Sequence, residues 1–223
     1  MRGLFVTATD TGVGKTEVTC ALVASARAGG LDAVALKPAQ SGAVPGEPSD
    51  AERLLAASGG VEPLDAVCPY AFAPPLAPAV AARVEGREIS FERIVEAAHA
   101  LGARHEAVLV EGAGGLLVPL TDGETYAELA QVLELPVLVV ARAGLGTVNH
   151  TSLTVEALRR RGLEIAGIVL NRASAGDDPS VPYNAGEIAR LTGIAPAVIL
   201  PFVADIETRA ATLRSMLAGK IQF

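Results

Sequence analysis

The sequence has 223 residues, of which 50% are hydrophobic and only 4% aromatic, and its formal net charge is −7. A chain of this length can bury a substantial core, so we expect residues 1–223 to form a single α/β domain. The negative charge argues against a nucleic-acid partner, which would need a basic surface. A membrane partner is not expected either, because no apolar run reaches the roughly 18 residues of a membrane span. Met1 and Arg2 lead directly into a strand-like run, and two cysteines make no disulfide framework, so we expect a cytoplasmic protein without a signal peptide.

Short, apolar, valine-rich runs alternate along the chain with segments of helix length. Both faces of these runs are apolar, which is typical of central strands in a parallel sheet covered by helices. Ser49 and Thr125 each precede a glutamate by three residues, as in a capping box, and paired glycines at 29–30 and 59–60 are typical helix stops. The pattern predicts a doubly wound, mostly parallel sheet flanked by helices. The predicted strands are residues 4–9, 33–38, 107–112, 136–142, 165–171 and 197–202, and the predicted loops are 43–48 and 69–78.

The motif ATDTGVGKT at residues 8–16 follows the first predicted strand and opens a helix. In a phosphate-binding loop, glycines such as Gly12 and Gly14 let successive backbone N–H groups approach phosphate oxygens at a helix N-terminus. Lys15 would then reach the β- and γ-phosphates, and the hydroxyl of Thr16 would bind Mg²⁺. The alternative is a glycine-rich turn with an incidental lysine. The position between a strand and a helix favours nucleotide binding.

The second predicted strand ends in KPAQSG at residues 37–42. If the carboxyl ends of the first and second strands lie together, Lys37 and Ser41 would lie beside the phosphate loop. A second lysine there could hold an anionic substrate group and offset charge during phosphoryl transfer. From spacing alone, a surface lysine at the end of a strand is the simpler interpretation. Asp50 begins a helix, where a carboxylate commonly serves only the helix N-terminus.

The third predicted strand runs into VEGAGGLLVPL at residues 110–120. Glu111 ends this strand, at the place where P-loop enzymes carry an acidic residue that completes the metal site. The glycines at 112, 114 and 115 could let the backbone approach phosphate closely. The alternative is a glycine-rich turn with a solvent-facing glutamate, which the upstream phosphate loop makes the weaker interpretation.

These motifs together resemble those of dethiobiotin synthetases in order and spacing. The combination of VEGAGG with LGxxNH is much more specific than GKT, and the resemblance covers nearly the whole chain. This chain differs from the family at Ala8, where glycine is usual, and the added methyl group could crowd the start of the loop and alter nucleotide affinity. The matching segments are TDTGVGKT at 9–16, KPAQSG at 37–42, SDA at 49–51, VEGAGGLLVPL at 110–120, LGTVNH at 145–150, NR at 171–172 and LPF at 200–202.

The resemblance implies a P-loop NTPase fold and a role for each matching residue. Lys15 and Lys37 are implied as the catalytic lysines, and Lys37 would engage the substrate carbamate and the γ-phosphate. Thr16, Asp50 and Glu111 are implied as Mg²⁺ ligands. The implied nucleotide-binding set is Gly12, Val13, Gly14, Lys15, Thr16, Glu17, Asp50, Glu111, Gly112, Ala113, Gly114, Asn171, Arg172, Pro201, Phe202 and Val203. The implied substrate-binding set is Thr11, Lys37, Ser41, Leu145, Gly146, Thr147 and Asn149.

The implied substrates are diaminopelargonic acid, CO₂ (from bicarbonate) and ATP with Mg²⁺. A carbamate forms on one amine, ATP phosphorylates it, and the second amine closes the cyclic urea. Asn171 is implied as the side chain that reads adenine, with Pro201 and Phe202 beside it. The segment 145–149 is implied to grip the substrate carboxylate across the interface of a homodimer.

Two other classes of protein share features of the phosphate loop. An amidating ligase of the cobyrinate type would need an appended glutaminase domain, for which 223 residues leave no room. A partitioning or membrane-positioning ATPase would act as a dimerising switch. Such ATPases typically carry a lysine early in the loop, in a KGGxGKT pattern, and no lysine precedes Lys15 within this loop.

The cysteines and histidines show no catalytic pattern. We expect Cys20 to be a small buried side chain, and Cys68, in a proline-rich segment, could be exposed. His99 and His105 flank the approach to the third strand and are expected at the surface. His150 belongs to the LGTVNH segment, where helix packing and ligand contact explain it equally well.

Overall fold

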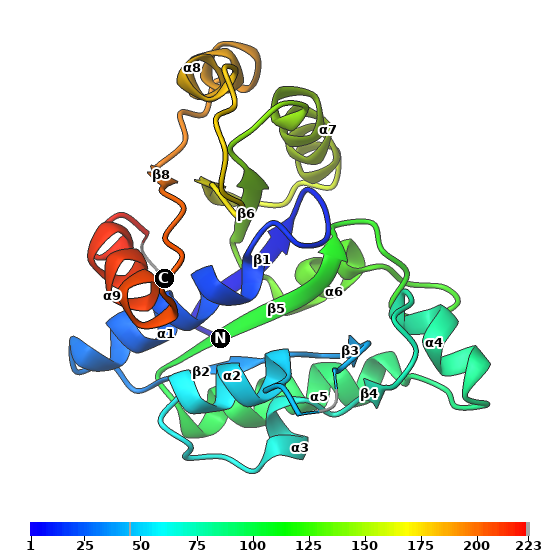
Figure 1. Ribbon diagram of the computed structural model, residues 1–223. Helices are drawn as coiled ribbons and strands as arrows, with labels where there is room; N and C mark the ends of the chain where they lie inside the picture. The colour runs from blue at the N-terminus through cyan, green and yellow to red at the C-terminus, as the bar shows by residue number, and fades with distance from the viewer. Residues whose placement is uncertain (45, 222–223) are drawn as a thin grey trace.

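A parallel sheet with helices on both faces forms the centre of the computed structural model, which describes residues 1–44 and 46–221 (Figure 1). Within these residues the main sheet has six strands in the order β2-β5-β1-β6-β7-β8, and every neighbouring pair is parallel. The predicted fold class is therefore confirmed. The strands are β1 (Gly3–Ala8), β2 (Ala33–Leu36), β5 (Ala107–Gly115), β6 (Val137–Arg142), β7 (Ile165–Asn171) and β8 (Val198–Leu200).

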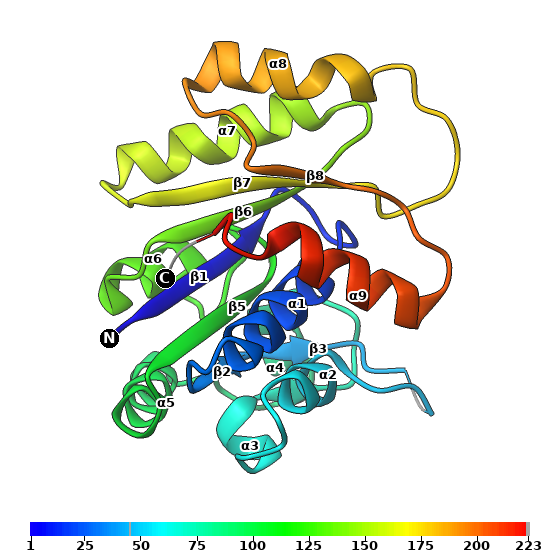
Figure 2. The ribbon, with the colours of Figure 1, turned by 90° about the vertical axis from the view of Figure 1, so that its left-hand side faces the viewer.

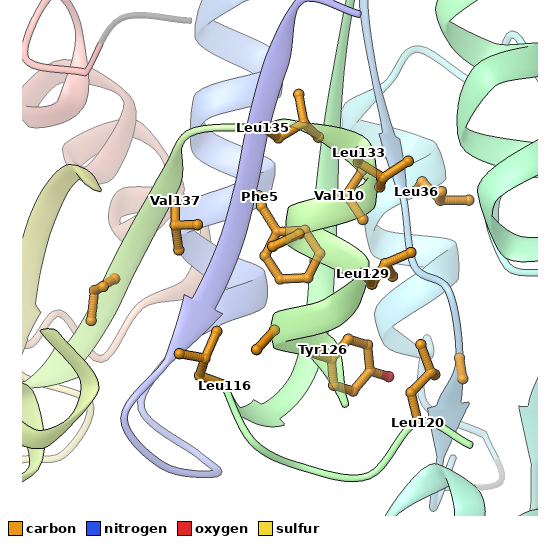
Figure 3. Packing of buried hydrophobic residues seen from close by; sticks show 14 of the residues in the cluster. Phe5, Leu36, Val110, Leu116, Leu120, Tyr126, Leu129, Leu133, Leu135 and Val137 are labelled. Carbon is orange, nitrogen blue, oxygen red and sulfur yellow. The ribbon is translucent and has the colours of Figure 1, made fainter. Parts of the chain in front are cut away.

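Helices cover both faces of the sheet (Figure 2). Two layers of apolar side chains pack between the sheet and these helices. Alternate residues of β1 point to opposite faces, so Phe5 belongs to one layer and Leu4 and Val6 to the other. Helices α5 to α8 contribute to the Phe5 layer, where Phe5 and Tyr126 lie with ring centroids 6.4 Å apart (Figure 3). Helices α1, α2 and α9 contribute to the other layer. The helices are α1 (Lys15–Ala28), α2 (Asp50–Ala57), α3 (Leu64–Val67), α4 (Pro78–Val84), α5 (Phe91–Arg104), α6 (Tyr126–Leu133), α7 (Thr147–Arg160), α8 (Val181–Thr192) and α9 (Ile206–Leu217).

The order of the strands corrects one expectation about the site. β1 and β2 are not neighbours, because β5 lies between them, and β2 and β8 lie at the edges of the sheet rather than inside it. Leu36 of β2 pairs with Val110 of β5, and Val6 of β1 pairs with Glu111. The carboxyl end of β5 therefore separates the phosphate loop from Lys37, and Glu111 lies between them.

The predicted helix ends are confirmed. Ser49 and Thr125 each form a full capping box with the glutamate three residues later. Helix α1 ends immediately before Gly29. Helix α2 ends at Ala57, and its C-cap residue, Ser58, immediately precedes the glycine pair 59–60.

The proline-rich segment 69–78 was predicted as a loop, but part of it is a strand. β4 (Ala71–Phe72) pairs in parallel with β3 (Gln40–Ser41) to form a small second sheet. The predicted loop 43–48 includes Pro45, which lies outside the described residues, as do the last two residues of the predicted domain. Among the helices that the structure describes, none is both long and apolar enough to cross a membrane.

The expectations for Cys68 and His105 were wrong. Cys68 is buried at the end of α3, and burial raises the pKa of its thiol to about 11. The His105 side chain is only 9% exposed, because its two ring nitrogens lie 2.8 Å from Asp32 Oδ2 and Glu62 Oε1. Cys20 is half-buried, and burial raises the pKa of its thiol to about 12. Neither thiol is poised to act as a nucleophile at neutral pH.

Candidate active site

The phosphate loop connects β1 to α1 at the carboxyl end of the sheet. Gly12 and Gly14 have φ angles of 72° and 89°, which glycine adopts without strain. A β-carbon on Gly14 would lie 2.1 Å from Nδ2 of Asn171, which donates a 2.9 Å hydrogen bond to the carbonyl of Val13. No side chain of the described residues caps the start of α1. The N–H groups of its first turn are thus available to an anion.

Beside this loop, four polar side chains from four different elements converge. Lys37 Nζ lies 2.7 Å from Glu111 Oε1 and 2.9 Å from Asp50 Oδ2. Thr16 donates from Oγ1 to the same Glu111 oxygen at 2.8 Å. The side chains of Lys37 and Glu111 are 3% and 0% exposed. The simpler interpretations are therefore wrong: Lys37 is not a surface lysine, Glu111 does not face solvent, and Asp50 does more than begin a helix.

Burial and charge set the protonation of this cluster. Burial disfavours the Lys37 ammonium, but Glu111 and Asp50 outweigh that effect and raise its pKa well above the ordinary value. Burial also opposes ionisation of Asp50, yet Lys37 more than compensates and lowers the pKa of that carboxyl group. For Lys15, burial dominates and lowers the pKa, although Glu111 partly opposes the shift. Lys37 is thus a fixed cation, whereas an anion in front of Lys15 would stabilise its charged form.

The oxygen atoms of this cluster suit a hard divalent cation. Glu111 Oε2 is buried and has no hydrogen-bond partner among the described residues. A buried carboxylate oxygen without a partner is costly, and a metal ion would satisfy it. Together with the Thr16 hydroxyl and the Asp50 carboxylate, it makes the kind of oxygen ligand set that Mg²⁺ prefers. The three predicted metal ligands therefore fit the ion.

A cleft of about 630 Å³ opens over the phosphate loop and the lysine–carboxylate cluster. Apolar side chains also line this cleft, among them Pro75, Leu76, Pro78 and Val118. Ser41 borders the cleft as well and donates from Oγ to the carbonyl of Leu76 at 2.6 Å. The cleft thus combines charged and apolar lining groups. The predicted site residues that line it are Thr11, Gly12, Gly14, Lys15, Thr16, Glu17, Lys37, Ser41, Asp50, Ala113 and Gly114.

Other predicted residues lie outside this cleft. Asn171 and Arg172, at the end of β7, border a second hollow of about 440 Å³ that shares Thr11 and Gly12 with the cleft. The remaining predicted residues that do not border the cleft, within the part of the chain described, are Val13, Glu111, Gly112, Leu145, Gly146, Thr147, Asn149, Pro201, Phe202 and Val203. Of these, Glu111 and Gly112 lie directly beneath it, where Lys37 Nζ contacts both.

The side chains of the segment 145–149 differ in exposure. Leu145 is 78% exposed, and its N–H donates to Asp178 Oδ2 at 2.7 Å. The Thr147 hydroxyl is buried and lies 3.3 Å from that of Thr151, one turn along α7. Asn149 is exposed. In the described residues of a single chain, this segment does not reach the cleft.

Two arginines that line the cleft were not predicted from the sequence. Arg53 lies three residues after Asp50 in α2, and helical spacing would have placed it on the same face. Arg209 lies in α9, far along the chain from every motif, and no sequence pattern pointed to it.

The methyl group of Ala8 packs in an apolar layer. Ala8 is the last residue of β1, is fully buried and has no left-handed backbone angle. Its methyl group belongs to the same apolar layer as Val13 and Val18. The pairing of β1 with β5 is irregular between Val6 and Ala8. Crowding of the loop by this methyl group therefore stays a prediction, which an Ala8→Gly variant tests.

The fold and this site define a P-loop NTPase: a parallel sheet whose first strand leads through a phosphate loop into a helix, with Lys15 and the carboxylate of Glu111 beside it. A family model described as an AAA domain matches residues 2–210. The fold is similar to that of MinD in the MinC:MinD cell division complex of Aquifex aeolicus (12% identity, TM-score 0.60, 99% of this chain and 89% of that chain). It is also similar to MinD bound to Mg-ADP from Pyrococcus horikoshii (16% identity, TM-score 0.55, 99% and 86%).

Relatives with much higher identity define the family more narrowly. The ATP-dependent dethiobiotin synthetase BioD of Anaeromyxobacter dehalogenans is 74% identical over the full length of both chains. The protein of the same name from Bacillus cereus is 39% identical over 96% of this chain and 89% of its own. This chain belongs to the dethiobiotin synthetase family. The two MinD proteins share its fold, but at 12–16% identity they show no more than that.

Proposed function

We propose that this chain catalyses the ATP-dependent ring closure of 7,8-diaminopelargonic acid with CO₂ to dethiobiotin, releasing ADP and phosphate. The observation that supports this most directly is the set of groups that line the cleft. Lys15 and Lys37 line it beside the phosphate loop, together with apolar groups such as Leu76 and Val118. A substrate with an aliphatic chain and reactive amines fits such a mixed lining.

In this proposal the two lysines act on charge rather than by forming a covalent bond. One substrate amine combines with CO₂ to give a carbamate, and a carbamate oxygen attacks the γ-phosphorus of ATP, so that ADP leaves. The second amine then attacks the carbonyl carbon of the mixed anhydride, and phosphate leaves as the urea ring closes. Both the carbamate and the triphosphate are anions. Lys15 and Lys37 offset their repulsion and hold them together, which lowers the barrier by proximity and electrostatic stabilisation.

We propose Thr16, Asp50 and Glu111 as the residues that hold Mg²⁺, which when bound supplies further positive charge against the phosphate oxygens. The unpartnered Oε2 of Glu111 supports this assignment. The backbone of Gly12–Thr16 would surround the phosphates, and Asn171 would contact adenine, since its side chain is already fixed against the loop at Val13.

We further propose a homodimer in which the segment 145–149 serves the cleft of the partner chain. The exposure of Leu145 (78%), just before α7, and of Leu153 (56%), on α7, supports an apolar contact surface there. The test is complementation between Lys37→Ala and Asn149→Ala chains, each expected to have little activity alone. If the segment acts across the interface, each mixed dimer keeps one intact site, and random mixing restores about a quarter of wild-type activity. A mixture as inactive as its components would refute a shared site.

We place the proposed enzyme in the cytoplasm as a single domain, and its activity is the first property to measure. ADP release and dethiobiotin formation are followed with MgATP, bicarbonate and diaminopelargonic acid, with each substrate omitted in turn. Product is expected only with all three, and the Lys37→Ala variant is expected to lose at least about 100-fold in rate. ATP hydrolysis without cyclic urea formation would refute the proposed reaction and favour a switch-type ATPase.

A further inference from the structure

Arg209 is one of the residues that connect α9 to the phosphate-loop helix, and it lies at the end nearest the loop. Its Nη1 donates to Glu17 Oε1 and its Nε to the carbonyl of Val203, both at 2.6 Å. Its guanidinium carbon lies 5.4 Å from the centre of the Phe202 ring. The side chains of Glu17 and Arg209 are each 21% exposed, so this pair is shielded from solvent over most of its surface. One guanidinium thus contacts three separate groups.

These contacts matter because the segment after β8 has little else to hold it. Pro201 and Ala204 are exposed, Phe202 and Val203 are only partly buried, and Ile206 is 75% exposed. No fully buried apolar side chain anchors the segment between Leu200 and Leu213. Its position relative to the phosphate loop therefore depends on the polar contacts of Arg209.

Glu17 is the residue immediately after Thr16, in the first turn of α1. A hydrogen bond from Arg209 to Glu17 therefore fixes the segment 201–203 relative to the helix that begins at the phosphate loop. Asn171, which pairs with Leu200 directly before this segment, is also tied to the loop by its hydrogen bond to Val13. The residues proposed to contact the nucleotide base are thus tied to the phosphate loop at two points.

We propose that Arg209 is a positioning residue for the base of the bound nucleotide, which it serves by holding the segment 201–203 at a fixed distance from the phosphate loop. The proposal rests on the proposed function only in that the nucleotide is ATP. Without Arg209, the segment 201–203 would have to be ordered each time a nucleotide binds. The conformational entropy lost in that ordering would weaken binding. Lysine cannot replace this arginine, because a single ammonium does not match the planar, forked contact with one carbonyl and one carboxylate.

The test compares Arg209→Met and Arg209→Lys with wild type by calorimetric titration of MgADP and of magnesium tripolyphosphate, which has no base. Arg214→Met is the matched control, since Arg214 lies on the same helix but does not border the cleft. Both Arg209 variants are expected to bind MgADP about tenfold more weakly and tripolyphosphate within about twofold of wild type. Arg214→Met is expected to bind both ligands normally. Glu17→Gln, which keeps an acceptor oxygen, is expected to lose less than Arg209→Met.

Three results would overturn the proposal: unchanged MgADP binding in Arg209→Met, an equal loss for ADP and tripolyphosphate, or an equal loss in Arg214→Met. An equal loss for both ligands would mean that Arg209 acts on phosphate charge. Thermal unfolding without ligand shows whether each variant is folded, and Glu17→Gln tests the same contact if Arg209→Met is not. Because the measurement is binding, it decides the role of Arg209 even if no dethiobiotin is formed by the wild type.

Discussion

Lys37 Nζ lies 2.7 Å from Oε1 of Glu111, and both side chains are shielded from solvent almost completely. The pair follows from the register of β2 with β5, since Leu36 pairs with Val110 and each strand continues into one of the two charged residues. A buried charge is tolerated only when it is paired. Glu111 is paired with Lys37 through one oxygen, while its other oxygen is buried and has no hydrogen-bond partner among the described residues.

Replacing Lys37 with methionine should remove activity and also lower the free energy of unfolding. Breaking a buried ion pair leaves a buried charge without compensation, which costs about 3 kcal/mol or more. A divalent cation beside Glu111 would restore the balance of charge. Millimolar Mg²⁺ should therefore raise the melting temperature of Lys37→Met more than that of wild type, as measured by thermal unfolding with and without MgCl₂.

Lys220→Met is the matched control, because Lys220 is exposed near the end of α9 and its loss removes the same charge. It should change stability by less than about 0.5 kcal/mol and respond to Mg²⁺ like wild type. If Lys37→Met were no less stable than Lys220→Met, the Lys37–Glu111 pair would not contribute to stability in the way described.

Gly14→Ala should abolish nucleotide binding for two separable reasons. The φ angle of 89° is strained for alanine, and the new methyl group would lie 2.1 Å from Asn171 Nδ2. Gly30→Ala is the control, because Gly30 has a φ angle of 87° but open space around its α-carbon. Both variants should lose about 1–2 kcal/mol of stability, whereas only Gly14→Ala should lose MgADP binding, by more than about tenfold. Normal MgADP binding by Gly14→Ala would show that the loop tolerates the methyl group.

Local features of this fold could be read from the sequence because neighbouring residues determine them. The apolar runs predicted every strand of the main sheet, and Ser49 and Thr125 predicted their helix starts. The order of the strands could not be read, since the insertion of β5 between β1 and β2 depends on contacts between residues about 75 positions apart in the chain. His105 was misplaced for the same reason, because its carboxylate partners Asp32 and Glu62 are distant in sequence.

Some residues of the candidate site could likewise be predicted from the sequence, and others could not. Lys15 and Thr16 lie within one motif, so the sequence alone favoured a phosphate site there. Lys37 and Asp50 gained their roles only from the family resemblance, and those roles stay predictions. The structure places both residues in one cluster, where Lys37 contacts Asp50 and Glu111. Arg209 belongs to no motif, so only the three-dimensional arrangement places it at the cleft.

Ala8→Gly should destabilise the protein without improving nucleotide binding, although glycine is usual at this position in the family. Ala8 is buried at the end of a strand with no left-handed angle, so glycine adds unfolded-state entropy and removes a packed methyl group, at a cost of about 1 kcal/mol. Ala35→Gly, another buried alanine in a strand of the same layer, should behave alike in urea unfolding. The Kd for MgADP should stay within about threefold of wild type in both variants. Tighter binding by Ala8→Gly alone would show that the methyl group does restrict the loop.

Stability at low pH should depend on the carboxylates around His105. Hydrogen bonding from His105 lowers the pKa of Asp32, and hydrogen bonding from Arg104 and then His105 lowers that of Glu62. A lowered pKa in the folded state means that these groups stabilise the protein above their unfolded pKa values, near 4, and lose that contribution as the pH falls through the folded values. The Asp32→Asn/Glu62→Gln variant should therefore be less stable than wild type at pH 7, and the difference should shrink between about pH 5 and pH 3. Urea unfolding between pH 7 and pH 3 measures this difference in the free energy of unfolding. Asp65→Asn is the control, because Asp65 is exposed and has no ion pair among the described residues. A difference that stayed constant from pH 7 to pH 3 would mean that the variant loses packing or neutral hydrogen bonds rather than these charges.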